Sequence, residues 1–128
     1  MSNDTPNSVS RRPILVVDDN EDALLVLRML LQLKGYGVQT CTSGQQALAL
    51  VEENPPEVIL LDISMPGMDG YETCRRLRQQ AWGKTGRIFA LTGYGQVENI
   101  EQGYKAGFDG YLVKPVDLDE LLKLLEKR

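Results

Sequence analysis

The sequence predicts one α/β domain, a doubly wound five-stranded parallel sheet flanked by five helices. From residue 13 onward, short apolar runs alternate five times with longer segments of helical period. The run from Val58 to Leu61 is wholly apolar, which is typical of a strand buried on both faces. The length of 128 residues fits a single domain. Because crossovers between parallel strands are right-handed, the alternation places helices on both faces of the sheet.

Five apolar runs are the predicted strands. The second run is the weakest, because polar residues interrupt it. The first, third, fourth and fifth runs each lead directly into a polar side chain. The runs cover residues 14–17, 38–42, 58–61, 88–91 and 111–113.

Each predicted strand is followed by a segment of helical period with recognisable ends. Asn20 and Ser43 are the expected N-caps of the first two helices. Gly35 provides the stop of the first helix, and Pro55 and Pro56 lie beyond the second. The helices are expected over about residues 20–34, 43–53, 71–80, 96–106 and 117–126.

Composition excludes several classes of function. The net charge of -4 and the lack of a Lys/Arg run argue against a nucleic-acid partner. The chain has no histidine, so imidazole metal sites, a histidine general base and a phosphohistidine donor are all excluded. Cys41 and Cys74 have no metal-ligand spacing, and no secretory signal follows Met1, which predicts reduced thiols in the cytoplasm. No apolar run approaches the ~20 residues of a membrane span, so no membrane association is expected.

Polar side chains stand at the ends of four predicted strands. Asp18 and Asp19 follow the first strand, Asp62 the third, Thr92 the fourth and Lys114 the fifth. The carboxyl ends of parallel strands meet at one rim, where ligands of such sheets bind. Three carboxylates at close range favour a cation, and oxygen-only ligands suit Mg²⁺. With a lysine and a hydroxyl added, the set suits a phosphoryl group with a carboxylate nucleophile.

Four segments in order resemble the receiver domain of bacterial response regulators (CheY-like). The segments are ILVVDDNED, VILLDISMPGMDGYE, IFALTGYG and GYLVKPVDLDEL. The resemblance runs from residue 13 to about residue 127 and implies the flavodoxin-like strand order 2-1-3-4-5. It divides the chain into a receiver domain over residues 13–128 and a polar tail over residues 1–12, which we expect to be disordered.

The resemblance implies a role for each residue at the rim. Asp62 is the expected phosphoacceptor, and Lys114 is expected to pair with a phosphoryl oxygen. Mg²⁺ is expected to bind Asp19 and Asp62 directly, Asp18 mainly through water, and the backbone carbonyl of Ser64. The chain would then be no enzyme beyond its own phosphorylation and dephosphorylation.

Further residues are implicated in switching. The resemblance implies that Thr92 turns towards the phosphoryl group and that Tyr111 then swings inwards. This changes the surface of the fourth helix, fifth strand and fifth helix, where an unknown downstream protein is expected to bind. The Lys114–Pro115 bond is expected to be cis. Tyr94 is predicted to shield the acceptor from water.

The expected phosphodonor is a sensor histidine kinase or a histidine phosphotransfer protein. Two helices carry more apolar residues than one buried stripe requires, and scattered exposed apolar residues are the ordinary alternative. The candidate docking residues are Ala23, Val26, Leu25, Met29 and Leu124.

Two other classes of function stay open. Haloacid dehalogenase-type phosphatases also form an aspartyl phosphate, but their nucleophile strand continues Asp-x-Asp, whereas Ile63 and Ser64 follow Asp62 here. A pure interaction module, or a receiver domain cut from a longer hybrid kinase, is the other alternative. The polar tail that starts at Met1 favours a separate protein.

Overall fold

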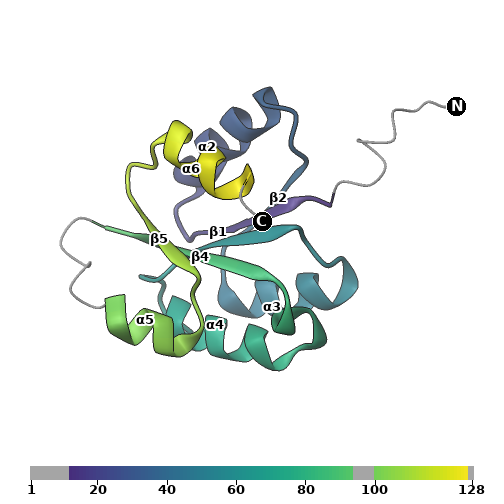
Figure 1. The fold of residues 1–128 in the computed structure, drawn as a ribbon, viewed down its shortest axis with the longest axis vertical. Helices are drawn as coiled ribbons and strands as arrows, with labels where there is room; N and C mark the ends of the chain where they lie inside the picture. Colours follow the sequence, from purple (N-terminus) through teal and green to yellow (C-terminus); the bar gives the residue numbers. More distant parts are fainter. Residues whose placement is uncertain (1–11, 94–99, 127–128) are drawn as a thin grey trace, which may run out of the picture.

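The computed structural model describes residues 12–93 and 100–126 and confirms the predicted sheet. Five parallel strands lie in the order β2-β1-β3-β4-β5, as the resemblance implied (Figure 1). The strands are β1 (Ile14–Val17), β2 (Val38–Cys41), β3 (Val58–Asp62), β4 (Arg87–Thr92) and β5 (Gly110–Val113).

Five α-helices cover the two faces of the sheet in the described residues (Figure 1). The helices α2 (Glu21–Leu33) and α6 (Leu118–Glu126) lie on one face. The helices α3 (Gly44–Glu53), α4 (Gly70–Gln79) and α5 (Ile100–Ala106) lie on the other. The predicted start of this last helix, at residue 96, lies outside the described residues.

The sheet is the shared wall of two hydrophobic clusters. Successive residues of β1 and β3 point to opposite faces, so Leu15 and Ile59 join the cluster under α3 and α4, while Val16 and Leu60 join the one under α2 and α6. All four of these side chains are buried. Burial on both faces explains why these strands appear in the sequence as unbroken apolar runs.

The helix ends follow the local signals of the sequence, with one addition. The side chains of Asn20 and Ser43 accept hydrogen bonds from backbone amides of α2 and α3, as expected of N-caps. Gly35 has a φ of 90°, the left-handed conformation expected of a helix stop. Asp69 caps α4 through a 3.0 Å bond from the Glu72 amide, so this helix begins earlier than predicted.

A short 3-10 helix, Ala81–Lys84, joins α4 to β4 and was not predicted. The Trp82 indole donates a 2.9 Å hydrogen bond to the Pro56 carbonyl oxygen. Its ring packs against Gly86, where a side chain would collide with it. Trp82, which has no evident role in the sequence, therefore fixes the path of the chain into β4.

Arg78 of α4 ties together two chain connections, the one from α4 to β4 and the one from α5 to β5. Its guanidinium donates hydrogen bonds of 2.6–2.9 Å to the carbonyl oxygens of Gly83, Gly86 and Gly107. It also lies 2.9 Å from a carboxylate oxygen of Asp109. Because these groups are partly buried, Arg78 satisfies backbone acceptors that would otherwise be costly to remove from water.

We predict that Arg78→Ala lowers the free energy of unfolding by about 2–4 kcal/mol, because several partly buried acceptors lose their donor together. The matched control is Arg75→Ala on the same helix. Arg75 pairs only with the exposed Glu72, so its loss is expected to cost no more than about 0.5 kcal/mol. Urea unfolding followed by the fluorescence of the single tryptophan measures both, and equal losses would contradict the assignment.

Candidate functional site

Three carboxylates meet at the carboxyl end of the sheet. Asp18 and Asp62 are almost fully buried, whereas Asp19 is exposed. One oxygen atom from each of the three lies within 4.8 Å of the others. Strands β1 and β3 are neighbours in register, with Val17 opposite Leu61, so the residues that follow have to meet. The sequence predicts that these three residues lie close together, and the structure confirms it.

Lys114 follows β5 at the same edge of the sheet and contacts two of the carboxylates. Its ammonium lies 2.9 Å from Asp18 and 3.3 Å from Asp62, and its backbone N–H donates a 2.7 Å bond to the Thr92 carbonyl oxygen. The Lys114–Pro115 bond is cis, as the resemblance implied. Burial lowers the pKa of Lys114, but the two carboxylates outweigh this effect and raise the pKa above the usual lysine value.

The ionised form of the Asp62 carboxyl is disfavoured when Lys114 is the only cation near it. Burial raises its pKa to about 6. The Ser64 amide, which donates a 3.0 Å bond to Oδ1, and the Lys114 ammonium lower the pKa, while Asp18 raises it. Two buried carboxylates therefore share one ammonium, and the excess negative charge favours a further cation.

The donor set fits a magnesium ion. Asp18, Asp19 and Asp62 offer only oxygen atoms, and their separation is small enough for one ion to join them. Ser64 is exposed beside them, so its carbonyl belongs to the same region of the chain. The acidic cluster thus has the chemistry expected of a Mg²⁺ site.

Two features of this site were missed in the sequence. The Asn20 backbone N–H donates a 3.0 Å bond to Asp18 Oδ1 and so orients that carboxylate. Gly70 packs its α-carbon against the end of β3, where a Cβ would lie 2.5 Å from the Asp62 carbonyl oxygen and from the Ile63 α-carbon. The Asp69–Gly70 pair has the composition of a turn, and its position after the acceptor loop was the one signal of this close packing.

The predicted switch residues lie on the neighbouring strands β4 and β5, with Thr92 opposite Val113 and Tyr111 opposite Ala90. Thr92 is fully buried, and its hydroxyl has no hydrogen-bond partner among the described residues. Tyr111 is half-buried and packs against the rings of Phe108 and Tyr104, at centroid distances of 6.1 Å and 5.7 Å. Tyr94 lies outside the described residues, so its shielding role stays a prediction.

The candidate docking residues do not form one surface. Ala23 and Val26 line a hollow of about 350 Å³ that also reaches Asp18 and Lys114. Leu124 is half-buried and packs against the cluster under α2 and α6, so the expectation that it lies off the buried stripe is wrong. The apolar stripe of α6 is broader than a narrow seam, because residues flanking Leu121 and Leu125 also touch the core.

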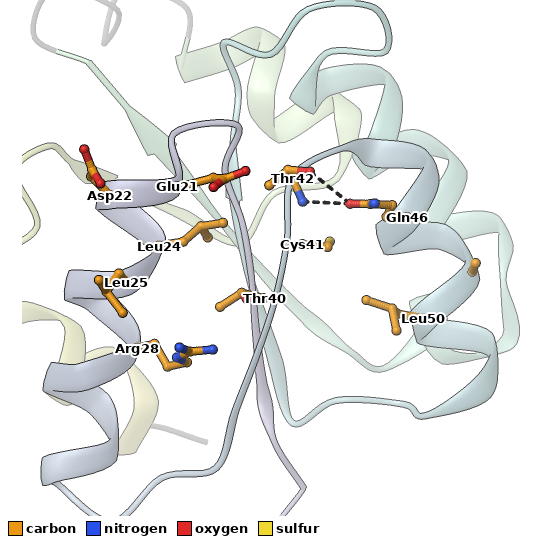
Figure 2. Close-up of a pocket in the computed structure, with 11 residues that line it drawn as sticks. Glu21, Asp22, Leu24, Leu25, Arg28, Thr40, Cys41, Thr42, Gln46 and Leu50 are labelled. Carbon is orange, nitrogen blue, oxygen red and sulfur yellow. Dashed lines mark hydrogen bonds between the residues drawn. The ribbon is translucent and has the colours of Figure 1, made fainter.

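A second and larger hollow, of about 740 Å³, lies between α2, β2 and α3 (Figure 2). Leu25 lines it from α2, and Thr42 donates two hydrogen bonds across its rim to Gln46. Cys41 at its floor is inert, since burial raises the pKa of the thiol to about 11. None of its lining residues belongs to the acidic cluster, so size alone does not identify the functional site.

Comparisons with known proteins agree with this geometry. A family model described as the response regulator receiver domain matches residues 14–126. An uncharacterised 14.6 kDa protein of Leptolyngbya boryana is 37% identical over 120 residues, 94% of this chain and 92% of that protein. The chemotaxis protein CheY4 of Vibrio cholerae matches with a TM-score of 0.85 at 34% identity, covering 91% of this chain and 98% of that one.

A third relative is longer than this chain. The DNA-binding dual master transcriptional regulator RpaA of Synechocystis is 35% identical over 109 residues, which is 85% of this chain but 45% of that protein. The chain therefore spans about half the length of the named transcriptional regulators it matches. Among the described helices, none is both long and apolar enough to cross a membrane.

We predict that Asp62→Asn stabilises the Mg²⁺-free protein at pH 8 by on the order of 2–3 kcal/mol, because each unit of pKa shift is worth about 1.4 kcal/mol. The folded pKa of about 6 lies above the ordinary value of 3.8. The protonated carboxyl therefore contributes stability below about pH 4, and this contribution is lost as the pH rises through 6.

The difference in free energy of unfolding between Asp62→Asn and the wild type should accordingly shrink as the pH falls from 8 towards 4. Urea unfolding in the presence of a chelator measures it, with the exposed Asp22→Asn as the control. A gap that stays constant over this pH range would show that the buried charge is not its cause.

Proposed function

The chain belongs to the response regulator receiver domain family, and on this premise we propose that it is a phosphorylation switch whose acceptor is the Asp62 carboxylate. The observation that carries the proposal is the buried Asp62 side chain, 3.3 Å from the Lys114 ammonium and beside Asp18 and Asp19. Receiver domains are signalling modules rather than classical enzymes, so any catalysis here concerns the chain's own acyl phosphate.

In the proposed reaction an Asp62 oxygen attacks the phosphorus of a phosphohistidine, the P–N bond breaks and the imidazole leaves. The product is an aspartyl phosphate. Lys114 is placed to neutralise charge on the transferring group, and the Ser64 amide holds the other side of the acceptor carboxylate. Asp18, Asp19, Asp62 and the Ser64 carbonyl would hold Mg²⁺, which supplies further neutralisation of phosphoryl charge.

The output is proposed to pass through Thr92 and Tyr111. A buried hydroxyl without a partner is costly, and a phosphoryl oxygen on Asp62 would offer Thr92 an acceptor. Drawing Thr92 towards the site would change the space beside Tyr111, whose ring packs from β5 against Tyr104 of α5 and against Phe108. The surface of α5, β5 and α6 would thereby present a phosphorylation-dependent face to a downstream protein.

The proposed phosphodonor is a sensor histidine kinase or a histidine phosphotransfer protein in the cytoplasm. The hollow lined by Ala23 and Val26 adjoins both Asp18 and Lys114, so a donor helix seated there would bring its phosphohistidine to Asp62. We propose that residues 13–128 act as a single receiver domain, with residues 1–12 as a tail. The net charge of -4 favours a protein partner over nucleic acid.

Incubation with Mg²⁺ and a small acyl phosphate, followed by intact-mass measurement, tests the acceptor. The wild type and Asp22→Asn are expected to gain one phosphoryl group, and Asp62→Asn none. Lys114→Ala should slow the gain by roughly 10²-fold, since one charge-stabilising donor is lost. An unmodified wild type, or equal modification of Asp62→Asn, would overturn the proposal.

The donor surface is tested separately with Val26→Glu. A carboxylate in the apolar hollow should slow transfer from a phosphohistidine protein by at least about tenfold, because docking would then bury an unpaired charge. Phosphorylation by the small acyl phosphate should stay at the wild-type rate. Gln45→Glu, exposed on α3, is the control. Transfer rates that do not differ between the two variants would place the donor elsewhere.

A further inference from the structure

The side chain of Tyr111 rests on the backbone of α5 at Gly103, where no side chain could fit beneath it. A Cβ at Gly103 would coincide with the Tyr111 hydroxyl and lie 2.6 Å from the ring carbon Cζ. Burial raises the pKa of Tyr111, and a hydrogen bond with the Gly103 backbone lowers it in part. Glycine is less favourable than alanine inside a helix, so its presence in α5 goes with this close approach.

Two aromatic rings complete the surroundings of Tyr111. The Tyr104 ring of α5 meets it edge-on, at a centroid distance of 5.7 Å and an interplanar angle of 78°. The Phe108 ring lies 6.1 Å away at 45°. Such ring pairs stabilise an arrangement beyond the area that they bury. We call Gly103, Tyr104 and Phe108 the tyrosine seat.

The backbone of the tyrosine seat is held in place from below. The Gly103 carbonyl oxygen accepts 3.1 Å hydrogen bonds from the amides of both Gly107 and Phe108, where α5 ends. The Arg78 guanidinium in turn donates bonds of 2.9 Å and 2.6 Å to the Gly107 carbonyl oxygen. This end of α5 is therefore tied to α4, and a group added at Gly103 would displace the Tyr111 ring rather than the helix.

We propose that Gly103 is a positioning residue, which holds Tyr111 in its resting place and thereby sets how many unphosphorylated chains have already switched. This inference rests on the proposed function, in which Tyr111 leaves its present contacts when Asp62 is phosphorylated. Phosphorylation then has to break the contact with Gly103. By linkage, a change that weakens this contact favours the phosphorylated form. The apparent affinity for a phosphoryl group is reduced by the same contact, since only the switched fraction is ready to bind.

Binding of Mg²⁺ with beryllium fluoride, an unreactive mimic of a phosphoryl group on a carboxylate, tests the coupling. Gly103→Ala should bind the mimic at least about fivefold more tightly than the wild type, because the added methyl group overpacks the seated form. Gln102→Ala, exposed on the same helix, should keep the wild-type affinity. Calorimetric titration measures all three, and Asp62→Asn, which lacks the acceptor, should bind none.

A second variant weakens the tyrosine seat without adding an atom. Tyr104 is 53% exposed, so Tyr104→Ala removes one ring of the seat with little effect on the core. The loss of the ring pair should tighten binding of the mimic by about twofold or more. This variant tests the same coupling independently of how well the chain tolerates a methyl group at Gly103.

Nuclear magnetic resonance of the tyrosine rings follows Tyr111 directly and needs no phosphoryl group. In chains with ¹³C-labelled tyrosine, the Tyr111 signals are those that vanish in Tyr111→Phe. Gly103→Ala should move these signals, in the free protein, towards the positions that they take in the wild type with the mimic bound. A glycine that served packing alone would not shift them in that direction.

A double-mutant cycle shows whether Gly103 acts through Tyr111. In a Tyr111→Ala background nothing opposes the added methyl group, so Gly103→Ala should leave the affinity for the mimic unchanged. It should also raise the ratio of folded to unfolded chains by roughly two- to fivefold, the gain expected of alanine over glycine in a helix. With Tyr111 present, the collision should remove this gain. Urea unfolding measures it.

The positioning role of Gly103 is wrong if Gly103→Ala and Tyr104→Ala bind the mimic no more tightly than the wild type does. It is also wrong if Gly103→Ala leaves the Tyr111 signals in place, or if it tightens binding equally in the Tyr111→Ala background. A wild type that binds no mimic would instead overturn the phosphoacceptor at Asp62, so the two failures are distinguishable.

Discussion

The structure depends on the sharing of one ammonium by two buried carboxylates. Asp18 and Asp62 both contact the Lys114 ammonium, and both side chains are almost fully buried. One positive charge cannot neutralise two negative ones. The site therefore carries uncompensated negative charge, which together with burial raises the pKa of Asp62. On the proposed function, the same imbalance would favour binding of a divalent cation and, beside it, of a phosphoryl group. The electrostatic cost of burying two carboxylates without a metal ion would then be relieved when the cation binds.

The sheet is what enforces this sharing. Because β1, β3, β4 and β5 run parallel and in register, residues as far apart in the sequence as Asp18 and Lys114 lie together at one edge. Most of this could be predicted, since buried parallel strands leave unbroken apolar runs and the polar residue after each run marks the edge. The N-caps Asn20 and Ser43 could also be predicted, because an N-cap is a local interaction between neighbours in the chain.

What the sequence did not reveal depends on contacts between distant segments. Arg78 resembles its neighbours on a polar helix face, and only the folded chain shows that three carbonyl groups converge on it, one of them 29 residues away in the sequence. Trp82 and Gly86 form a pair by packing rather than by pattern. Leu124 was misplaced because helical periodicity gives the direction of the buried stripe but not its width, which the opposing side chains determine. Within the site, the close packing of Gly70 against the end of β3 is likewise a contact between two segments, which a local sequence pattern does not show.

Helix α2 links the acidic cluster to the rest of the molecular surface. Its first turn follows the cap residue Asn20, whose amide orients Asp18, and its side chain Val26 borders the hollow proposed for the phosphodonor. The same short stretch of chain therefore orients one carboxylate of the site and borders the hollow on which the proposed donor would dock. A protein donor seated there would contact the element that holds Asp18 in place. A small acyl phosphate has no need of that surface, so on this proposal its reaction with Asp62 is independent of Val26.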